Sequence, residues 1–280
     1  MSAGSDVSII VVHYKDVAET ARCVASLGSG CAGLVYEIVL VDNSPSQELV
    51  SSPLPDMPAG SVVSLGRNAG LARATNFALR RCTGRYYLCL NPDVVATPQS
   101  IRSLVCFADS HPHSGIVAAR LENGDRTLQL SCRRFYTLKH ALVRRTFLGR
   151  VLPATTINAD HLMEDYDHSA SANVDWVLGS CMLVRATAVA DIGPMDERFF
   201  LYFEDVDWCY RMHKGGWDVV YFPGATMIHL HKRDSAVSGL NRQKLAHLAS
   251  FVAFHDKHGW ALLWRRPDTF RLLEPVAGSS

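Results

Sequence analysis

The sequence predicts an α/β fold built on a mostly parallel sheet that is flanked by helices. Apolar runs at 7–12, 37–41, 62–65 and 86–90 contain few polar residues, which is typical of strands buried on both faces. Helical segments at 16–28 and 70–81 lie between them, and turn signals at 42–45 and 91–93 follow two of the runs. This alternation favours a doubly wound sheet, in which ligands bind at the carboxyl ends of the strands.

The second half of the chain follows the same alternation less regularly. A helix is expected from 98 to about 110, short strands at 115–119 and 219–222, and one strand-like segment at 174–185. A basic amphipathic helix is one interpretation of 138–152, inside the stretch 120–172 that is hardest to place. The tail at 241–264 is expected to be helical because Leu245, Leu248 and Val252 recur near helical spacing.

Composition excludes several classes of protein. Of 280 residues, 48% are hydrophobic and 20% are charged, and the net charge of +1 favours no polyanionic partner such as nucleic acid. Eight cysteines form no C-x-x-C pair, and the N-terminus is polar, so we expect reduced thiols and a cytoplasmic protein. No apolar run approaches the roughly 18 residues that a membrane span needs, so any membrane contact is expected to be peripheral.

One segment is strongly basic. No acidic residue occurs between Asp125 and Asp160, whereas seven basic residues do: Arg126, Arg133, Arg134, Lys139, Arg144, Arg145 and Arg150. Such a run is usually a solvated face, and it is also the kind of segment that binds phosphates or an anionic membrane surface.

The segment FFLYFEDVDWCYR at 199–211 places three carboxylates directly after an apolar run. Glu204, Asp205 and Asp207 begin an expected helix, where acidic residues usually serve as caps and dipole partners. A carboxylate beside a hydrophobic wall also suits a general base. Asp207 lies four residues before Arg211, so we expect it to form a structural helical pair.

Three further features are candidates for ligand binding, and each has a plain structural alternative. Asp93 follows a buried strand, where a hard oxygen ligand suits Mg²⁺ or Mn²⁺, although a turn-capping aspartate is common there. His229 and His231 alternate on an extended segment and point to one side, as metal ligands or as surface histidines. The loop at 66–70 enters a helix with Arg67 beside it, as a phosphate site or as a connection.

Seven segments together resemble the family 2 inverting glycosyltransferases, particularly their bacterial rhamnosyltransferase-like branch. The resemblance covers residues 7 to about 235 and is carried by VSIIVVHYK, EIVLVDNS, GRNAGLARATNFAL, YYLCLNPDVV, SCRRFYTLKHALVRRTFLGR, VDWVLGSCMLVR and GPMDERFFLYFEDVDWCYRMHKGGW. It implies a Rossmann-like GT-A fold over 1–235, with a nucleotide-binding half (1–97) and an acceptor half (98–235). A C-terminal helical extension at 236–280 follows.

The resemblance also implies roles for individual residues. It assigns Asp205 as the catalytic base, Asp93 as the ligand of a divalent cation (Mg²⁺ or Mn²⁺), and His229 as a second metal ligand. Glu204 is expected to hold the acceptor or to support Asp205. The resemblance places the nucleotide-sugar donor against a further set of side chains: His13, Tyr14, Asp42, Arg67, Asn68, Asn91, Asp93 and Trp176. Core packing is the alternative for Trp176. Asn91 stands where the D-x-D motif has an aspartate, which leaves one negative charge fewer near the cation.

The implied reaction is transfer of a sugar from a nucleotide donor, with inversion at the anomeric carbon. The resemblance favours dTDP-L-rhamnose as donor and a cell-surface polysaccharide or polyprenyl-diphosphate-linked glycan as acceptor. Arg133, Arg134, Arg144 and Arg145 are expected to meet the acceptor diphosphate or anionic headgroups at the inner face of the plasma membrane. A UDP-sugar donor (galactofuranose or GlcNAc) and a non-catalytic glycan-binding module are the alternatives.

Overall fold

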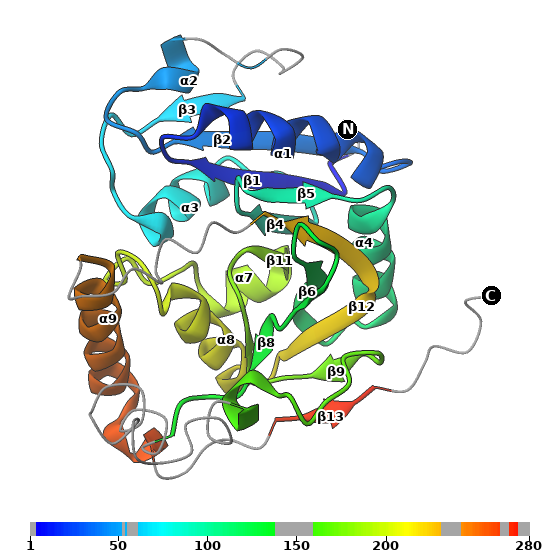
Figure 1. The fold of residues 1–280 in the computed structure, drawn as a ribbon, viewed down its shortest axis with the longest axis vertical. Helices are drawn as coiled ribbons and strands as arrows, with labels where there is room; N and C mark the ends of the chain where they lie inside the picture. Colours follow the sequence, from blue (N-terminus) through cyan, green and yellow to red (C-terminus); the bar gives the residue numbers. More distant parts are fainter. Residues whose placement is uncertain are drawn as a thin grey trace.

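A twisted central sheet organises the chain (Figure 1). The computed structural model describes residues 4–51, 54, 61–137, 159–230, 242–263 and 269–273. Four parallel strands form the N-terminal part of the sheet, and all four were predicted: β1 (Val7–His13), β2 (Tyr36–Asp42), β3 (Val62–Ser64) and β4 (Tyr86–Leu90). The order of strands along the sheet is β13-β9-β12-β6-β11-β4-β1-β2-β3. The α/β prediction is therefore confirmed.

The other half of the sheet is mixed. Strand β11 (Cys181–Arg185) runs antiparallel between β4 and β6 (Ser114–Glu122), and β12 (Asp218–His229) runs parallel to β6. The expected single strand at 174–185 is wrong: the chain forms β9 (Ala172–Asn173), β10 (Trp176–Val177) and β11 instead. It is divided because its main-chain groups bond to different neighbours, with Val174 N–H donating to Val219 and Leu178 N–H donating to Ser131.

Short strands complete the sheet at its edges. Strand β5 (Val94–Ala96) pairs with the end of β12, and β7 (Leu128–Gln129) pairs with the end of β6. Strand β13 (Arg271–Leu272) pairs with β9, and β8 (Cys132–Arg133) forms a separate two-stranded ribbon with β10. The pairing of β5 with β12 places His229 opposite Val94, next to the predicted metal ligand Asp93.

The helices cover both faces of the sheet because the strands are apolar on both sides. Ile9 and Val11 of β1 belong to a core that contains residues of α1 (Val17–Gly30) and α4 (Ser100–Ser110). Ile10 and Val12 point to the other core, which includes residues of α3 (Leu71–Leu79), α7 (Ala186–Ile192) and α8 (Glu204–Lys214). The short helix α2 (Glu48–Ser51) follows β2. This layering leaves the carboxyl ends of β1, β2 and β4 at one edge.

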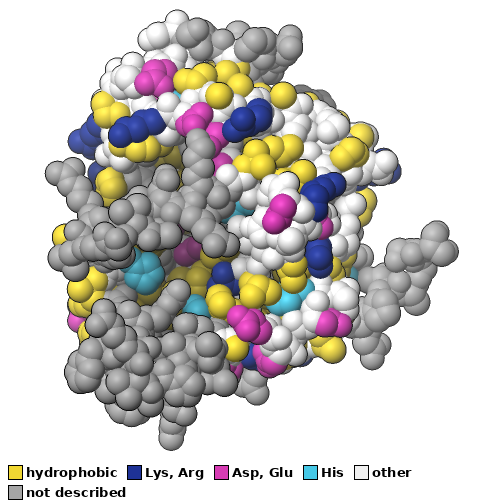
Figure 2. Space-filling model, in the orientation of Figure 1, with side chains coloured by type: hydrophobic (Ala, Val, Ile, Leu, Met, Phe, Trp, Pro, Cys, Tyr) yellow, Lys and Arg dark blue, Asp and Glu magenta, His cyan; other side chains and the backbone are white. Residues whose placement is uncertain are grey.

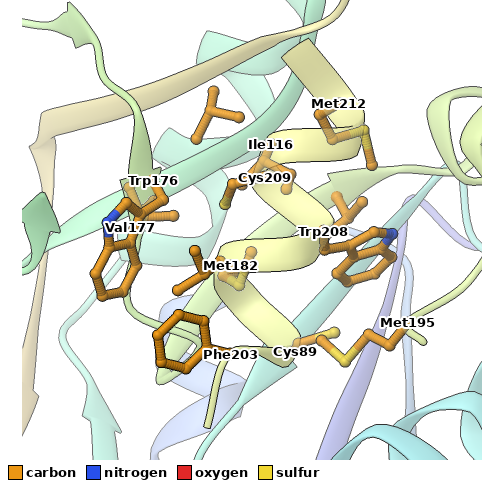
Figure 3. Close-up of a cluster of buried hydrophobic side chains, with 14 of the residues drawn as sticks. Cys89, Ile116, Trp176, Val177, Met182, Met195, Phe203, Trp208, Cys209 and Met212 are labelled. Carbon is orange, nitrogen blue, oxygen red and sulfur yellow. The ribbon is translucent and has the colours of Figure 1, made fainter. Parts of the chain in front are cut away.

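Helix α8 is anchored by its apolar face. Trp208, Cys209 and Met212 are fully buried, and Figure 3 shows them packed with Trp176, Met182, Phe203 and other buried side chains. The indole N–H of Trp208 donates to the carbonyl of Gly193 at 3.0 Å. The carboxylates at the start of α8 therefore project from a helix that has little freedom to move.

The tail is helical, as expected, and it packs against the core through part of its surface. Helix α9 (Arg242–His258) is followed by a 3₁₀ turn (Trp260–Leu263). Phe251, Phe254 and His255 are buried, whereas the apolar residues used to predict the helix, Leu245, Leu248 and Val252, are about half exposed. Within the ranges given above, no helix is both long and apolar enough to cross a membrane.

Charge is distributed evenly over the visible surface. Figure 2 shows one face, on which acidic, basic and hydrophobic side chains are interspersed over the described part of the chain. This agrees with the net charge of +1.

Candidate functional site

The carboxyl ends of β1 and β2 hold two predicted nucleotide-site residues. Asp42 is fully buried, and its two carboxylate oxygens accept main-chain N–H groups, from Ser44 at 3.0 Å and from Leu49 at 2.9 Å. These bonds fix the loop after β2. The predicted contact of Asp42 with a nucleobase stays a prediction, and it would have to share a carboxylate whose oxygens are already engaged.

His13 and Tyr14 differ sharply in exposure. His13 is fully buried, its Nδ1 lies 2.8 Å from the Thr20 hydroxyl, and its Nε2 lies 3.8 Å from Glu48. Burial lowers the pKa of His13. Tyr14 is 41% exposed, with the ammonium of Lys15 4.9 Å from its ring centroid. Of the pair, only Tyr14 presents its side chain to a ligand without rearrangement.

The loop at 66–70 is held by two asparagines. The side-chain oxygen of Asn43 accepts the N–H of Ala69 at 2.8 Å, and that of Asn68 accepts the N–H of Gly70 at 3.1 Å. Asn43 also donates to Asn68 at 3.2 Å. The N–H groups of Ala69 and Gly70 already have acceptors, and the choice between a phosphate site and a plain connection stays a prediction. The exposed Arg67 is the group that remains to meet a diphosphate.

Asp93 and His229 lie together, as predicted. His229 Nε2 is 3.2 Å from Asp93 Oδ2, and the imidazole is 5% exposed. On the other side of the ring, Nδ1 is 2.7 Å from the side-chain oxygen of Gln129 in β7. No cluster of three or more His, Cys, Asp or Glu side chains that could bind a metal occurs in the part of the chain that the structure describes. Asp93 and His229 are thus the two predicted metal ligands that the structure brings together, and their binding of a cation stays a prediction.

Gly179 and Ser180 join this strand end to the start of α8. The N–H of Gly179 donates to Asp205 Oδ2 at 3.0 Å, and the carbonyl of Ser180 accepts the N–H of Asn91 at 3.0 Å. A Cβ at position 179 would lie 3.4 Å from the Cβ of Asp205, an ordinary van der Waals distance, so the two residues are direct neighbours. A single dipeptide therefore links the predicted base to the Asn-Pro-Asp motif.

Asp205 and Glu204 form an asymmetric carboxyl pair. Asp205 is partly exposed and accepts a second bond, from the N–H of Val206 at 2.8 Å. Burial raises the pKa of Asp205, while these N–H bonds and the charge of Arg133 act in the opposite direction. Burial and the charge of Asp205 raise the pKa of Glu204 well above its ordinary value. Of the two carboxyls, Glu204 therefore favours the protonated form more strongly than Asp205 does.

Glu204 is 4% exposed, and its Oε2 is buried without a hydrogen-bond partner. It lines a small pocket together with Asn91 and Gly179, between apolar side chains of β1, β4 and α3. A neutral carboxyl facing Asn91 supplies a hydrogen-bond donor that a second carboxylate would not.

Asp207 makes the structural pair that the sequence predicts. It is fully buried, and its Oδ2 accepts from Arg211 Nε at 2.8 Å. Its Oδ1 also accepts from Lys257 and His258 of α9, both at 2.7 Å. Despite the cost of burial, these partners lower the pKa of Asp207 to about 2. Asp207 thus binds α9 to α8 and belongs to the scaffold.

The residues predicted for an acceptor or membrane surface separate into two groups. Arg134 is engaged by Asp165 through two bonds of 2.7 Å, and Trp176 is 5% exposed with its indole N–H donating to Arg134. Core packing describes this environment of Trp176, and its predicted sugar contact stays a prediction. Arg133 is half-buried, beside Asp205. Arg144, Arg145 and His231 lie outside the described residues.

Gln129, Gly179 and Asn43 are site residues that sequence reasoning missed. Gln129 lies 100 positions before His229, and no local pattern connects the two. Gly179 lies two residues before β11, and no local pattern connects it with Asp205. Asn43 was treated only as part of a turn signal.

Comparison with known proteins agrees with this geometry. The model of the family described as Glycosyl transferase family 2 matches residues 8–185, and the model described as Glycosyl transferase family group 2 matches residues 114–274. The N-acetylglucosaminyl-diphospho-decaprenol L-rhamnosyltransferase of Mycobacterium tuberculosis (strain ATCC 25618 / H37Rv) is 28% identical over 276 residues, which cover 92% of this chain and 86% of the relative.

Two further proteins extend the comparison. Rhamnosyltransferase WbbL of Escherichia coli (strain K12) is 27% identical over 71% of this chain and 75% of its own length. The crystal structure of GalNAc-T7 with UDP, GalNAc and Mn²⁺ matches with a TM-score of 0.64 at 13% identity, over 91% of this chain. The match covers 48% of the GalNAc-T7 chain and shows the fold alone, which is the GT-A fold that the sequence predicts.

Proposed function

The chain belongs to glycosyl transferase family 2, and on that premise we propose that it transfers L-rhamnose from dTDP-L-rhamnose to a lipid-linked or polysaccharide acceptor. The names of two relatives, an N-acetylglucosaminyl-diphospho-decaprenol L-rhamnosyltransferase and a rhamnosyltransferase, support the sugar and the acceptor class. One observation carries the mechanism: Gly179 and Ser180 hold the carboxylate of Asp205 and the strand-end residue Asn91 on either side of one dipeptide.

The proposed reaction is a single displacement with inversion. Asp205 accepts the proton of the acceptor hydroxyl, and that oxygen forms a bond to the anomeric carbon from the face opposite the leaving group. The bond between the anomeric carbon and the diphosphate oxygen breaks, and its electron pair leaves with the nucleoside diphosphate. The N–H groups of Gly179 and Val206 keep the carboxylate oriented before the proton arrives.

Glu204 has a supporting part in this proposal. Held neutral by burial and by the charge of Asp205, it donates a hydrogen bond within the pocket beside Asn91. It thereby leaves Asp205 as the single ionised carboxylate at the start of α8. The exposed guanidinium of Arg67 is proposed to bind the diphosphate from the other side of the site.

The donor set fits a divalent cation. A carboxylate oxygen of Asp93 and an imidazole nitrogen of His229, 3.2 Å apart, are ligands that Mn²⁺ and Mg²⁺ accept, with diphosphate oxygens as the further ligands. Bound there, the cation would supply positive charge to the leaving diphosphate.

The acceptor is proposed to approach along the basic segment. Arg133 lies beside Asp205 and is the described arginine best placed to meet an acceptor diphosphate. Arg134 would first have to release Asp165. Cosedimentation at low salt with vesicles rich in anionic lipid tests peripheral membrane binding, and an unchanged supernatant would contradict it.

Asp205→Asn tests the mechanism. We expect transfer to fall by about 10²–10⁴-fold, the range typical of a lost general base, while binding of dTDP-L-rhamnose is kept. Asp256→Asn, an isosteric change at an exposed position of α9, is the matched control and should transfer normally. Transfer that survives in Asp205→Asn would contradict the assigned base.

The donor is tested separately. Thermal shift of the wild-type protein with dTDP-, UDP- and GDP-sugars, each with and without Mn²⁺, should show the largest stabilisation with dTDP-L-rhamnose. A shift with UDP-sugars alone would replace the proposed donor with a UDP-sugar, such as UDP-galactofuranose or UDP-GlcNAc.

A further inference from the structure

A chain of side-chain hydrogen bonds runs from the turn between β6 and β7 to His229. It begins at Asp125 in the turn and passes through Thr127 and Asn123 to Gln129, which contacts His229 Nδ1 at 2.7 Å. Its other links are Thr127 Oγ1 to Asp125 Oδ1 at 2.6 Å, Asn123 Nδ2 to Thr127 Oγ1 at 2.9 Å, and Gln129 Nε2 to Asn123 Oδ1 at 3.3 Å. None of these four residues has a part in the mechanism above.

The donor and acceptor roles along this series of hydrogen bonds follow from Asp125. An ionised carboxylate accepts hydrogen bonds and donates none, so the hydroxyl of Thr127 must donate to Asp125. The bonds from the hydroxyl and main-chain N–H of Thr127 lower the pKa of Asp125, which keeps it ionised. The single hydroxyl proton of Thr127 is thus used in the bond to Asp125, so the hydroxyl oxygen can only accept a hydrogen bond from Asn123.

The same logic continues to the imidazole. Because the amide nitrogen of Asn123 faces Thr127, its oxygen faces Gln129, and Gln129 must donate to it through Nε2. The amide oxygen of Gln129 therefore faces His229 and can only accept. It follows that Nδ1 of His229 carries a proton, and that the neutral ring has its lone pair on Nε2.

That lone pair faces another acceptor. His229 Nε2 lies 3.2 Å from Asp93 Oδ2, so in the neutral Nδ1–H ring an imidazole lone pair and a carboxylate oxygen point toward each other. Two acceptors at this distance repel unless a positive charge lies between them. The arrangement suits a cation that binds to both atoms.

We propose that Gln129 is a positioning residue that fixes the Nδ1–H tautomer of His229 and so makes Nε2 a metal ligand. The metal part of this inference rests on the proposed function, whereas the tautomer does not. Imidazole ligands depend on such outer partners, and loss of one typically costs 10–100-fold in metal affinity. Asn123, Thr127 and Asp125 act through Gln129, each one hydrogen bond further from His229.

The series of hydrogen bonds from Asp125 to His229 is called the relay below. Three variants of the full-length protein distinguish control of the His229 tautomer by this relay from a merely structural role of Gln129. Gln129→Leu removes the acceptor, whereas Gln129→Glu keeps an acceptor oxygen at the same place. Arg126→Gln is the matched control, because Arg126 lies in the same turn, 59% exposed, and takes no part in the relay. The primary measurement is the ¹⁵N chemical shifts of the His229 ring in metal-free protein at alkaline pH, assigned with His229→Gln.

Wild type and Arg126→Gln are expected to show the Nδ1–H tautomer, and Gln129→Leu is expected to shift toward Nε2–H. Mn²⁺ titration in the presence of dTDP should give a Kd raised about 10–100-fold in Gln129→Leu and a near-normal Kd in Gln129→Glu. An Nε2–H ring in wild type, or an unchanged tautomer in a folded Gln129→Leu, would overturn the relay. The Nδ1–H tautomer without any Mn²⁺ binding in wild type would uphold the relay and overturn the metal site instead.

Discussion

The carbonyl oxygen of Phe200 accepts a 2.9 Å hydrogen bond from the main-chain N–H of Leu71, the first residue of α3. Phe200 lies in the loop that leads into α8, so the bond connects the helix after the Arg67 loop to the approach of the predicted base. Two residues of that approach, Tyr202 and Phe203, have φ angles of 67° and 68°. Such strain persists where the surroundings hold the backbone, and it often occurs at functional sites.

Gly70→Ala is expected to loosen this connection. Gly70 has φ 88° and ψ 162°, a region open essentially to glycine, and a Cβ there would lie 2.7 Å from the Phe200 carbonyl oxygen. We expect a loss of stability larger than the roughly 1–3 kcal/mol of backbone strain alone, together with reduced transfer. Gly193→Ala is the control, because Gly193 has φ 87° and ψ 169° with nothing within 4 Å of its Cβ position. Urea unfolding that gives equal losses for the two variants would contradict the role of the Phe200 contact.

Asp207→Asn is expected to destabilise the protein by about 3–5 kcal/mol, the usual cost of removing one member of a buried ion pair. Lys257, His258 and Arg211 would lose their shared acceptor. Because the folded pKa of Asp207 is lowered to about 2 from 3.8, its stabilisation is complete above about pH 4 and is lost as the pH falls toward 2. Denaturant unfolding should therefore show the gap between wild type and variant closing over that range. A constant gap would mean that Asp207 does not contribute through its charge.

Glu204→Gln is expected to stabilise the protein at alkaline pH. The folded pKa of Glu204 is raised, so its contribution to stability is complete below the unfolded value near 4.5 and is lost as the pH rises through the folded pKa. The variant avoids that loss, and each kcal/mol gained should raise Tm by about 2–4 °C. Glu197→Gln gives the opposite sign, because bonds from Asn76 and Arg73 lower the pKa of Glu197. A Tm difference between wild type and Glu204→Gln that does not grow from pH 5 to pH 8.5 would contradict a buried, neutral Glu204.

Asn91→Asp is expected to tighten metal binding. Asn91 occupies the first position of the Asn-Pro-Asp motif, and a carboxylate there would restore a second negative charge near Asp93. We expect the Kd for Mn²⁺ to fall about tenfold, and activity removed by chelation to return at lower Mn²⁺ concentrations. Calorimetry with dTDP present measures the affinity. An unchanged Kd would place residue 91 outside the coordination sphere.

Sequence reasoning found the parts of the fold that depend on local pattern. The strands of the N-terminal half were predicted because each is a short apolar run that needs no knowledge of its neighbours. Strand β11 was not separated from β10, since its limits depend on which strands bond to it. The spacing of apolar residues predicted α9 as a helix but not which side chains it buries: Phe251 and Phe254 lie in the core, whereas Leu245 and Leu248 are about half exposed.

Some residues of the candidate site could likewise be predicted from local sequence, and others could not. Asp93, Glu204 and Asp205 were singled out because each lies at the end of a strand or the start of a helix, positions that local sequence marks well. Gln129 could not be found, because its role depends on a turn packed against a strand that follows 100 residues later. The protonation state of each carboxyl could not be predicted from the sequence either, because a pKa depends on burial and on neighbouring charges.

The ion pairs of Asp207 determine how short the chain can be. Lys257 and His258 lie near the end of α9, yet both neutralise a carboxylate buried beneath the predicted base. A protein truncated anywhere before Lys257 would keep that carboxylate without two of its three cationic partners. Helix α9 is therefore part of the minimal folding unit, and because β13 pairs with β9 in the central sheet, any fusion or trimming of this protein should begin after β13.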